Sequence, residues 1–335
     1  MQPVLPNPPM LPDQVTIYGK RYQAKFANWH ILHQSALNHV ILWQVTASFC
    51  PLQAACASHR QQTAANLPLV IKTLLPTAST LSQAQLSHEI GMLQTCQQFA
   101  ICALAENKSE ASHKLATKQA GVAQLLFYDI TPNATCGGFL AMPCYAAPNL
   151  RQLIGEQSLN FAQSLTIAHQ LCRTLNALHD LNLLHGDVKP SNILYAPDHQ
   201  QLIVLDFALA QNLPPAHSQV LPPSMTTAGT PAYMAPEQFM GATPSRAQEN
   251  YSVGVILFEL FTNTRPFTAA TIRNWAYAHQ NSPLPDIKAR IETRFANDTT
   301  FNAQQADLLG KFIGSLLAKH PVNRQNLLGI TQIFA

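Results

Sequence analysis

The stretch His185-Gly186-Asp187-Val188-Lys189-Pro190-Ser191-Asn192 holds the residues that decide the fold and the chemistry of this chain. Asn192 stands five positions after Asp187, and a short string, Leu205-Asp206-Phe207, follows it. The Asp187 carboxylate can accept a proton from an attacking hydroxyl, while Asn192 and Asp206 offer hard oxygen ligands to Mg²⁺. A single Asp is usually a solvated turn or cap residue. The complete string, in contrast, predicts ATP-dependent phosphoryl transfer.

A second string, Gly229-Thr230-Pro231-Ala232-Tyr233-Met234-Ala235-Pro236-Glu237, lies further along the chain. Together the strings resemble the catalytic loop, the magnesium loop and the end of the activation segment of eukaryotic-type Ser/Thr protein kinases, including the bacterial members. The resemblance runs from about Trp29 to the C-terminus. It implies a two-lobed α+β fold, with a small, mainly antiparallel β N-lobe that has one main helix, and a larger helical C-lobe.

The order of the predicted elements, strands first and helices afterwards, favours the same α+β class. A hairpin is expected over 15–26, a helix over 81–104, strands over 122–130 and 138–145, and a second helix over 161–181. The chain is expected to divide into a Pro-rich extended arm at 1–14, an N-lobe at 15–145 with insertions near 47–66 and 104–120, and a C-lobe at 146–335.

Lys72 closes the apolar run Leu69-Val70-Ile71, and Glu89 follows seventeen residues later. Leu86, Glu89 and Leu93 share one face of the predicted helix because of their three- and four-residue spacing. Taken alone, a surface lysine and a solvated helix acid would be the simpler interpretation. Because the same chain contains the string at 185–192, we expect the two side chains to pair, so that Lys72 is held against the α- and β-phosphates of ATP.

The resemblance also assigns roles residue by residue. Asp187 is the expected catalytic base or hydroxyl-orienting group, and Lys189 is expected to neutralise charge on the transferring phosphoryl group. Thr230 is expected to bond to both side chains, and Glu237 to pair with Arg324. The expected ATP-binding residues are of three kinds. They are the apolar positions Val40, Val70, Met142 and Leu194, the residues Cys144 and Tyr145 of the linker between the lobes, and Ser35 and Asn38, which are placed by counting back from Val40.

Several positions depart from the family pattern. The glycine-rich loop is missing, because His33, Ser35 and Asn38 stand at its three glycine positions, so weaker nucleotide handling is expected. Ala208 replaces the glycine of the magnesium loop. Gly186 replaces an arginine that receives a phosphorylated activation loop in many kinases, so we expect activity without loop phosphorylation.

Two further departures concern side-chain size. Val70 stands where an alanine is usual and is expected to crowd the adenine. Glu249 stands where the family has an aspartate that braces the catalytic loop, and the longer acid is expected to keep that function.

Bulk composition argues against other classes of protein. The net charge is only +3, and no basic run with interleaved aromatic residues appears, so nucleic acid is not an expected partner. No run approaches the ~18 apolar residues of a membrane span. Without a secretory signal, the seven cysteines are expected to be free, mostly buried thiols of a cytoplasmic protein.

The leading prediction is therefore a Ser/Thr protein kinase that uses ATP and Mg²⁺, has a protein as its substrate and offers its N-lobe insertions to a regulatory partner. One alternative is a nucleotide-binding scaffold or regulator with little turnover, because the glycine-rich loop is absent. Another is a small-molecule kinase, since His185-Gly186-Asp187 also resembles aminoglycoside and choline phosphotransferases. The peptide-docking stretch at 229–237 counts against that second alternative.

Overall fold

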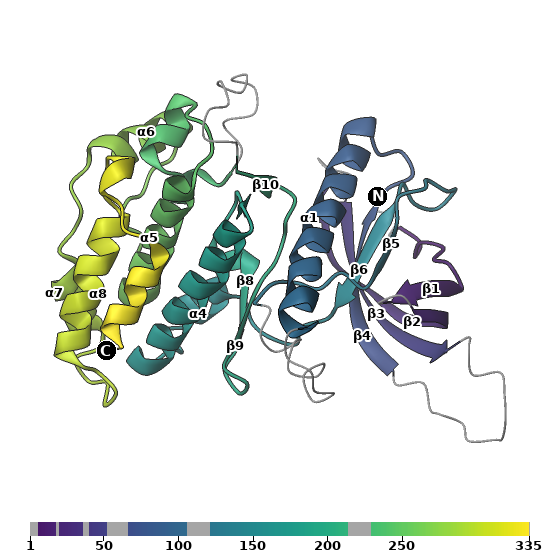
Figure 1. Ribbon diagram of the computed structural model, residues 1–335, viewed down its shortest axis with the longest axis horizontal. Helices are drawn as coiled ribbons and strands as arrows, with labels where there is room; N and C mark the ends of the chain where they lie inside the picture. The colour runs from purple at the N-terminus through teal and green to yellow at the C-terminus, as the bar shows by residue number, and fades with distance from the viewer. Residues whose placement is uncertain are drawn as a thin grey trace, which may run out of the picture. The chain divides into compact units, whose positions relative to one another are not determined.

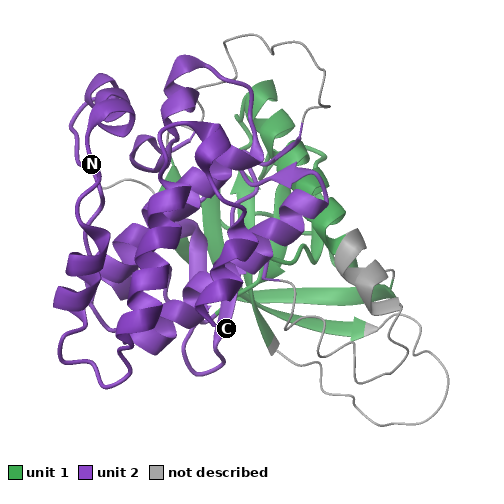
Figure 2. Ribbon diagram, turned by 60° about the vertical axis from the view of Figure 1, so that its left-hand side comes forward, with its two compact units in different colours: residues 1–106, 123–145 green, residues 107–122, 146–335 purple. Residues whose placement is uncertain are grey.

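The computed structural model describes residues 6–17, 20–35, 40–51, 66–105, 121–213 and 229–334. The chain divides into two units, one formed by residues 1–106 and 123–145 and the other by residues 107–122 and 146–335 (Figure 2). Most of the two expected insertions, at 52–65 and 106–120, lies outside the described residues.

Unit 1 contains a six-stranded sheet in the order β1-β2-β3-β4-β6-β5 (Figure 1). Every pair of neighbouring strands is antiparallel. The hairpin expected over 15–26 is present as β1 and the first part of β2. The strands are β1 (Gln14–Ile17), β2 (Lys20–Ser35), β3 (Val40–Pro51), β4 (Asn66–Leu74), β5 (Phe127–Asp129) and β6 (Phe139–Pro143).

The strand expected over 122–130 is wrong in its extent, since β5 covers only Phe127–Asp129. Val122 instead forms an isolated parallel bridge to Val204, and the Val204 amide donates to the carbonyl of Gly121 at 2.7 Å. This backbone pairing takes Val122 into unit 2. Residues 122–129 therefore pair with two different segments, Val122 with the distant Val204 and β5 with the nearby β6.

The two faces of the unit 1 sheet differ in burial. On β3, Ile41, Trp43 and Val45 are buried in the hydrophobic core, whereas the alternate residues Val40 and Leu42 are only partly buried. Since side chains alternate between faces along a strand, one face of the sheet forms the core and the other, here called the accessible face, is only partly buried along β3. The accessible face is the one on which Lys72 lies, because Lys72 pairs with Leu42.

The Pro-rich arm has no regular secondary structure over residues 6–12 but packs against the rest of unit 1. Pro9 is buried, and the backbone amide of Met10 donates to Thr135 Oγ1 at 2.9 Å. Residues 6–9 line a cavity of about 260 Å³ together with Ile41 and Trp43. The arm thus covers the core side of β3.

The long helix of unit 1 is α1 (Thr80–Ala105), where a helix over 81–104 was predicted. Leu86, Glu89 and Leu93 are all buried, at 3%, 2% and 1% exposure, so the predicted buried stripe is confirmed. A carboxylate in such a stripe requires a partner, because burial of an unpaired charge is costly.

Unit 2 is mainly helical (Figure 1). Its central helix α5 packs against α4, α7 and α8, and Gly254 on α5 has no room for a side chain, since a Cβ there would lie 2.9 Å from Leu316 Cβ. Two short antiparallel strand pairs complete the unit, β7 (Leu183–Leu184) with β10 (Gln211–Asn212) and β8 (Ile193–Ala196) with β9 (Gln201–Val204). The helices are α3 (Leu150–Gly155), α4 (Phe161–Asp180), α5 (Arg246–Thr262), α6 (Ile272–Asn281), α7 (Ile287–Arg294) and α8 (Ala303–Leu316).

The start of α4 illustrates why these segments are helical. Asn160 caps the helix by accepting a hydrogen bond from the backbone amide of Gln163, and the Gln163 side chain accepts from the amide of Asn160 in return. This capping box satisfies two amides that a helix start leaves free. An antiparallel sheet with one main helix in unit 1, and a helical unit 2, confirm the predicted α+β class.

Candidate active site

The loop that follows β7 is organised around a buried histidine. His185 is 0% exposed, and its Nε2 lies 2.8 Å from the carbonyl oxygen of Leu205. Its ring packs against Phe207, with 5.0 Å between ring centroids, while its Nδ1 lies 3.3 Å from the backbone nitrogen of Asp187. His185 therefore connects the loop that carries Asp187 to the loop that carries Asp206.

The Asp187 carboxylate contacts both polar side chains that the family resemblance assigned to it. Its Oδ1 accepts hydrogen bonds from the backbone amide of Thr230 at 3.0 Å and from Thr230 Oγ1 at 2.9 Å. Lys189 Nζ forms an ion pair with Oδ2 of Asp187 and donates to Thr230 Oγ1 at 3.1 Å. The structure thus brings together three residues from two distant segments, and their bonds orient the carboxylate.

A backbone hydrogen bond connects the two segments that carry Asn192 and Asp206. The Leu205 amide donates to the Asn192 carbonyl at 2.8 Å, and Asn192 Nδ2 donates to the carbonyl of Asp187 at 3.1 Å. Asp206 is exposed and has a φ of 65°, a left-handed conformation that few residues other than glycine adopt. Backbone strain of this kind is concentrated at functional sites.

The oxygen donors of Asn192 and Asp206 fit Mg²⁺ in kind, because this ion prefers carboxylate and amide oxygens and keeps water and phosphate as its remaining ligands. The described ranges contain no group of three or more His, Cys, Asp or Glu side chains that could hold a metal by itself. A site that depends on the phosphates of a nucleotide does not need such a group.

Glu249 on α5 contacts the start of the catalytic loop. Its Oε1 accepts the backbone amides of His185 at 2.8 Å and Gly186 at 3.1 Å, and its Oε2 lies 2.7 Å from His179 Nε2. Burial opposes ionisation of this carboxyl, but the contact with His179, the charge of His185 and the Gly186 amide hold the pKa of Glu249 below its ordinary value. The longer acid thus contacts the loop through two amides.

His179 was missed by the sequence analysis, although a signal existed. It stands four residues after Leu175 and seven after Cys172, on the buried stripe of α4, and it is 3% exposed. A polar residue on the apolar face of a helix implies a buried polar partner. The partner could not be named without the tertiary contact.

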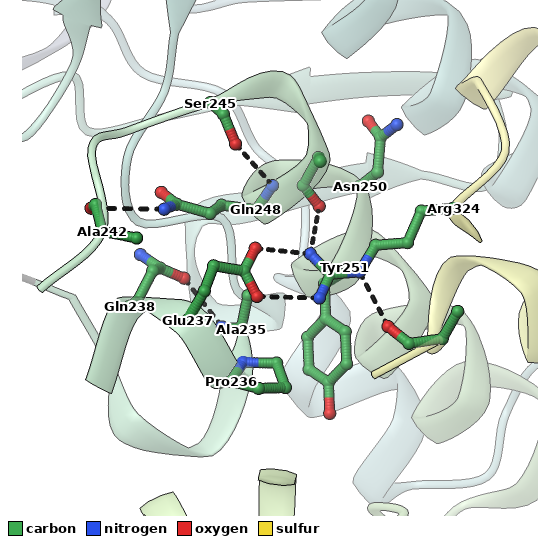
Figure 3. Close-up of polar contacts among 12 residues, drawn as sticks. Ala235, Pro236, Glu237, Gln238, Ala242, Ser245, Gln248, Asn250, Tyr251 and Arg324 are labelled. Carbon is green, nitrogen blue, oxygen red and sulfur yellow. Dashed lines mark hydrogen bonds and ion pairs between the residues drawn. The ribbon is translucent and has the colours of Figure 1, made fainter. Parts of the chain in front are cut away.

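Glu237 and Arg324 form a bidentate ion pair (Figure 3). Nη1 of Arg324 lies 2.6 Å from Oε1 of Glu237, and Nη2 lies 2.8 Å from Oε2. The Arg324 guanidinium also donates to the carbonyls of Ala247, Ala318 and Lys319 at 2.9, 2.8 and 3.1 Å. The pair ties the end of the 229–237 segment to the start of α5 and to the chain after α8.

In unit 1, Lys72 Nζ lies 2.7 Å from Glu89 Oε2. The lysine side chain is 16% exposed and the glutamate 3%, so the pair joins the accessible face of the sheet to the buried stripe of α1. Burial of the carboxylate strengthens its electrostatic interaction with the Lys72 ammonium. The ion pair with Glu89 thus connects the Lys72 ammonium to α1.

The residues expected around the nucleotide belong to both units. Val70 on β4 pairs in register with Met142 on β6, and Val40 begins β3 opposite Ser35, the last residue of β2. Their side chains are partly buried, as are those of the linker residues Cys144 and Tyr145 and of Leu194 on β8 of unit 2. Asn38 lies outside the described residues.

Position 186 accepts only glycine. Gly186 has a φ of 82°, and a Cβ built there would lie 2.2 Å from the carbonyl oxygen of Leu209. An arginine at this position would require movement of the backbone as well as a strained conformation. The departure from the family pattern is thus accommodated by the local structure.

The comparisons with known proteins agree with this arrangement. A family model described as the protein kinase domain matches residues 55–334. The chain is 30% identical over 195 residues to the serine/threonine-protein kinase pkn3 of Myxococcus xanthus, which covers 56% of this chain and 33% of that protein. It is 28% identical over 188 residues to the serine/threonine-protein kinase PknB of Mycobacterium tuberculosis, which covers 56% and 28% of the two chains.

The chain belongs to the protein kinase domain family. The predicted resemblance to bacterial Ser/Thr kinases and the predicted kinase fold are confirmed. The chain spans about a third or less of the length of the curated relatives it matches.

Two general expectations, on membrane spans and on cysteines, can be compared with the described residues. No helix in the described ranges combines the length and the apolar character needed to cross a bilayer. The cysteines described there, Cys50, Cys96, Cys136, Cys144 and Cys172, are free thiols, and three of them are buried.

Proposed function

We propose that this chain is a Ser/Thr protein kinase that transfers the γ-phosphoryl group of ATP, with Mg²⁺, to a hydroxyl of a protein substrate. The observation that carries the proposal is the contact of the Asp187 carboxylate with Thr230 and Lys189. A carboxylate held between a cation and a segment that resembles a peptide-docking stretch is suited to orient an incoming alcohol. The names of the curated relatives support the choice of Ser and Thr.

In this proposal each polar residue has a separate task. Asp187 accepts a hydrogen bond from the attacking hydroxyl, and Lys189 neutralises charge that develops on the transferring phosphoryl group. Asn192 and Asp206 would hold Mg²⁺, which neutralises phosphate charge when it is bound. These four residues orient the acceptor hydroxyl and the γ-phosphoryl group of ATP without forming a covalent intermediate.

Unit 1 supplies the groups that bind the nucleotide. Lys72 contacts the α- and β-phosphates and is held in position by Glu89, a task that the 2.7 Å ion pair supports. The adenine and ribose would contact the apolar and linker positions that the family resemblance indicates: Val40, Val70, Met142, Cys144, Tyr145, Leu194, Ser35 and Asn38.

The retained polar groups favour turnover over a scaffold function. A protein that only binds nucleotide has no need for a carboxylate bonded to both a lysine and a threonine beside the metal-binding loop. We therefore propose ATP and Mg²⁺ as cofactors and a protein as substrate, with a regulatory partner at the N-lobe insertions. The free thiols support a reducing, cytoplasmic location.

Labelled ATP tests this function directly. The purified chain is incubated with γ-labelled ATP, Mg²⁺ and a mixture of a generic protein acceptor, an aminoglycoside and choline. We expect label on Ser or Thr of the protein, loss of label when Mg²⁺ is chelated, and none on the small molecules. Label on the aminoglycoside or choline would show a small-molecule kinase. Nucleotide binding without any labelled product would show a scaffold.

A further inference from the structure

A histidine of β2 lies on the same face of the unit 1 sheet as Lys72. His33 pairs in register with Leu42 on β3, and Leu42 pairs with Lys72 on β4. Residues that pair directly across antiparallel strands project their side chains to the same face. His33, Leu42 and Lys72 therefore form one row across three strands, on the accessible face of the sheet.

An irregularity in β2 is what gives His33 this orientation. Ile31 pairs with the core residue Trp43, and the register shifts between Ile31 and His33, so that Leu32 is an extra residue. Without the extra residue, His33 would pair with Ile41 and project to the core face, because a slip of one residue reverses the face. Bulges that redirect a side chain are common beside active sites.

The geometry also brings the two polar side chains within reach of one ligand. Neighbouring strands are about 4.8 Å apart, so the backbones of His33 and Lys72, two strands apart, are separated by roughly 10 Å. His33 is exposed, and the Lys72 ammonium is partly exposed. A polyphosphate lying over this row can accept hydrogen bonds from both residues.

We propose that His33 is a nucleotide-binding residue whose imidazole N–H donates a hydrogen bond to an α- or β-phosphate oxygen of bound ATP. In this way a side chain supplies the donor that backbone amides of a glycine-rich loop would otherwise provide. The assignment rests on the proposed function, since that function brings the phosphates to Lys72. The assigned contact joins His33 to the polyphosphate, and His33 makes no contact with the nucleoside.

Equilibrium binding of MgADP and of adenosine tests the assignment without requiring turnover. The variants are His33→Ala, His33→Asn, which retains an N–H donor, and Gln34→Ala as the control. Gln34 is the adjacent exposed residue, and it pairs with Ile41, so it projects to the opposite face. Thermal unfolding of all variants checks that the fold is kept.

We expect His33→Ala to weaken MgADP binding about tenfold, the effect of losing a hydrogen bond to a charged group, and to change adenosine binding less than twofold. His33→Asn should restore part of the MgADP affinity, and Gln34→Ala should bind both ligands as the wild type does. Equal losses for MgADP and adenosine, or no loss for MgADP, would overturn the proposal.

The outcomes separate this inference from the proposed function. If the wild type binds MgADP with the expected dependence on His33 but labels no acceptor, the kinase function fails and the inference stands. If the wild type labels protein while His33→Ala binds MgADP normally, only the inference fails. A wild type that binds neither ligand would reject both.

Discussion

His179 at the end of α4 and Glu249 on α5 form a buried pair, with 2.7 Å between Nε2 and Oε2. The second oxygen of the same carboxylate accepts the amides of His185 and Gly186. Two helices and the catalytic loop therefore meet at one side chain. Asp187 follows these two amides directly, so we expect its orientation to depend on a carboxylate that touches neither nucleotide nor acceptor in the proposed mechanism.

Replacing Glu249 tests that dependence. Glu249→Gln keeps the size of the side chain but removes its charge, so the buried contacts with His179 and the two amides lose their charge-assisted character, at a cost of about 1–3 kcal/mol. We expect a lower free energy of unfolding in urea and a reduced kcat, with KM for ATP little changed. The control is Glu292→Gln, since Glu292 on α7 is 44% exposed. Equal unfolding midpoints for both variants would contradict this account.

The ion pair between Arg324 and Glu237 should be sensitive to a conservative change. The Arg324 side chain is fully buried and its guanidinium donates to both oxygens of Glu237. Lysine keeps the charge but cannot form the planar two-pronged contact, so Arg324→Lys should lower the free energy of unfolding by about 3 kcal/mol. Chemical unfolding with exposed Arg273→Lys as control measures this. A loss of less than about 0.5 kcal/mol, the size of an ordinary surface change, would contradict it.

His279 predicts a pH dependence of stability. Burial, with the nearby charge of Lys319, lowers the pKa of His279 to about 4 from an ordinary 6.5. Below pH 6.5 the unfolded chain binds a proton that the folded chain does not bind until about pH 4. Stability should therefore fall with acidification across this window, by up to about 1.4 kcal/mol per pH unit from this group.

Unfolding of wild type and His279→Gln across that pH window is the measurement. The variant should show a shallower fall in stability, while exposed His199→Gln should follow the wild type. Parallel curves for all three proteins would show that His279 does not titrate as its burial implies.

Activity should not depend on phosphorylation of the activation segment. Gly186 leaves no arginine to receive a phosphate, and the backbone there excludes a larger side chain. Thr226 and Thr227 lie outside the described residues. We expect the Thr226→Ala, Thr227→Ala double variant to keep its phosphoryl-transfer rate within about threefold, a barrier change well below 1.4 kcal/mol. The control is Thr166→Ala, at a partly exposed position of α4. A collapse of the rate in the double variant but not in this control would refute independence from phosphorylation.

The sequence was most informative where function depends on local spacing. The five-residue step from Asp187 to Asn192 and the helical spacing around Glu89 concern neighbours in the chain, so their arrangement follows from local geometry. The contact of Asp187 with Thr230 and the pair of Glu237 with Arg324 were expected only from the family resemblance. No local rule links residues that far apart.

Features that arise from tertiary pairing could not be predicted. The partner of Glu249 was unknown until α4 and α5 were placed side by side. The extra residue Leu32, which changes the face on which His33 lies, follows from the register of β2 on β3, and a single strand does not contain that information. The packing of Pro9 on the core side of β3 likewise depends on a surface formed by distant residues.

The most direct test of the central claim is the rate of phosphoryl transfer by Asp187→Ala, measured with labelled ATP beside the MgADP affinity of the same preparation. We predict that transfer to protein Ser or Thr falls by about 10²–10⁴-fold, as expected for loss of a general base, while MgADP binds within twofold of the wild type. Transfer at the wild-type rate with Ala at position 187 would contradict the assignment of this carboxylate and the mechanism built on it.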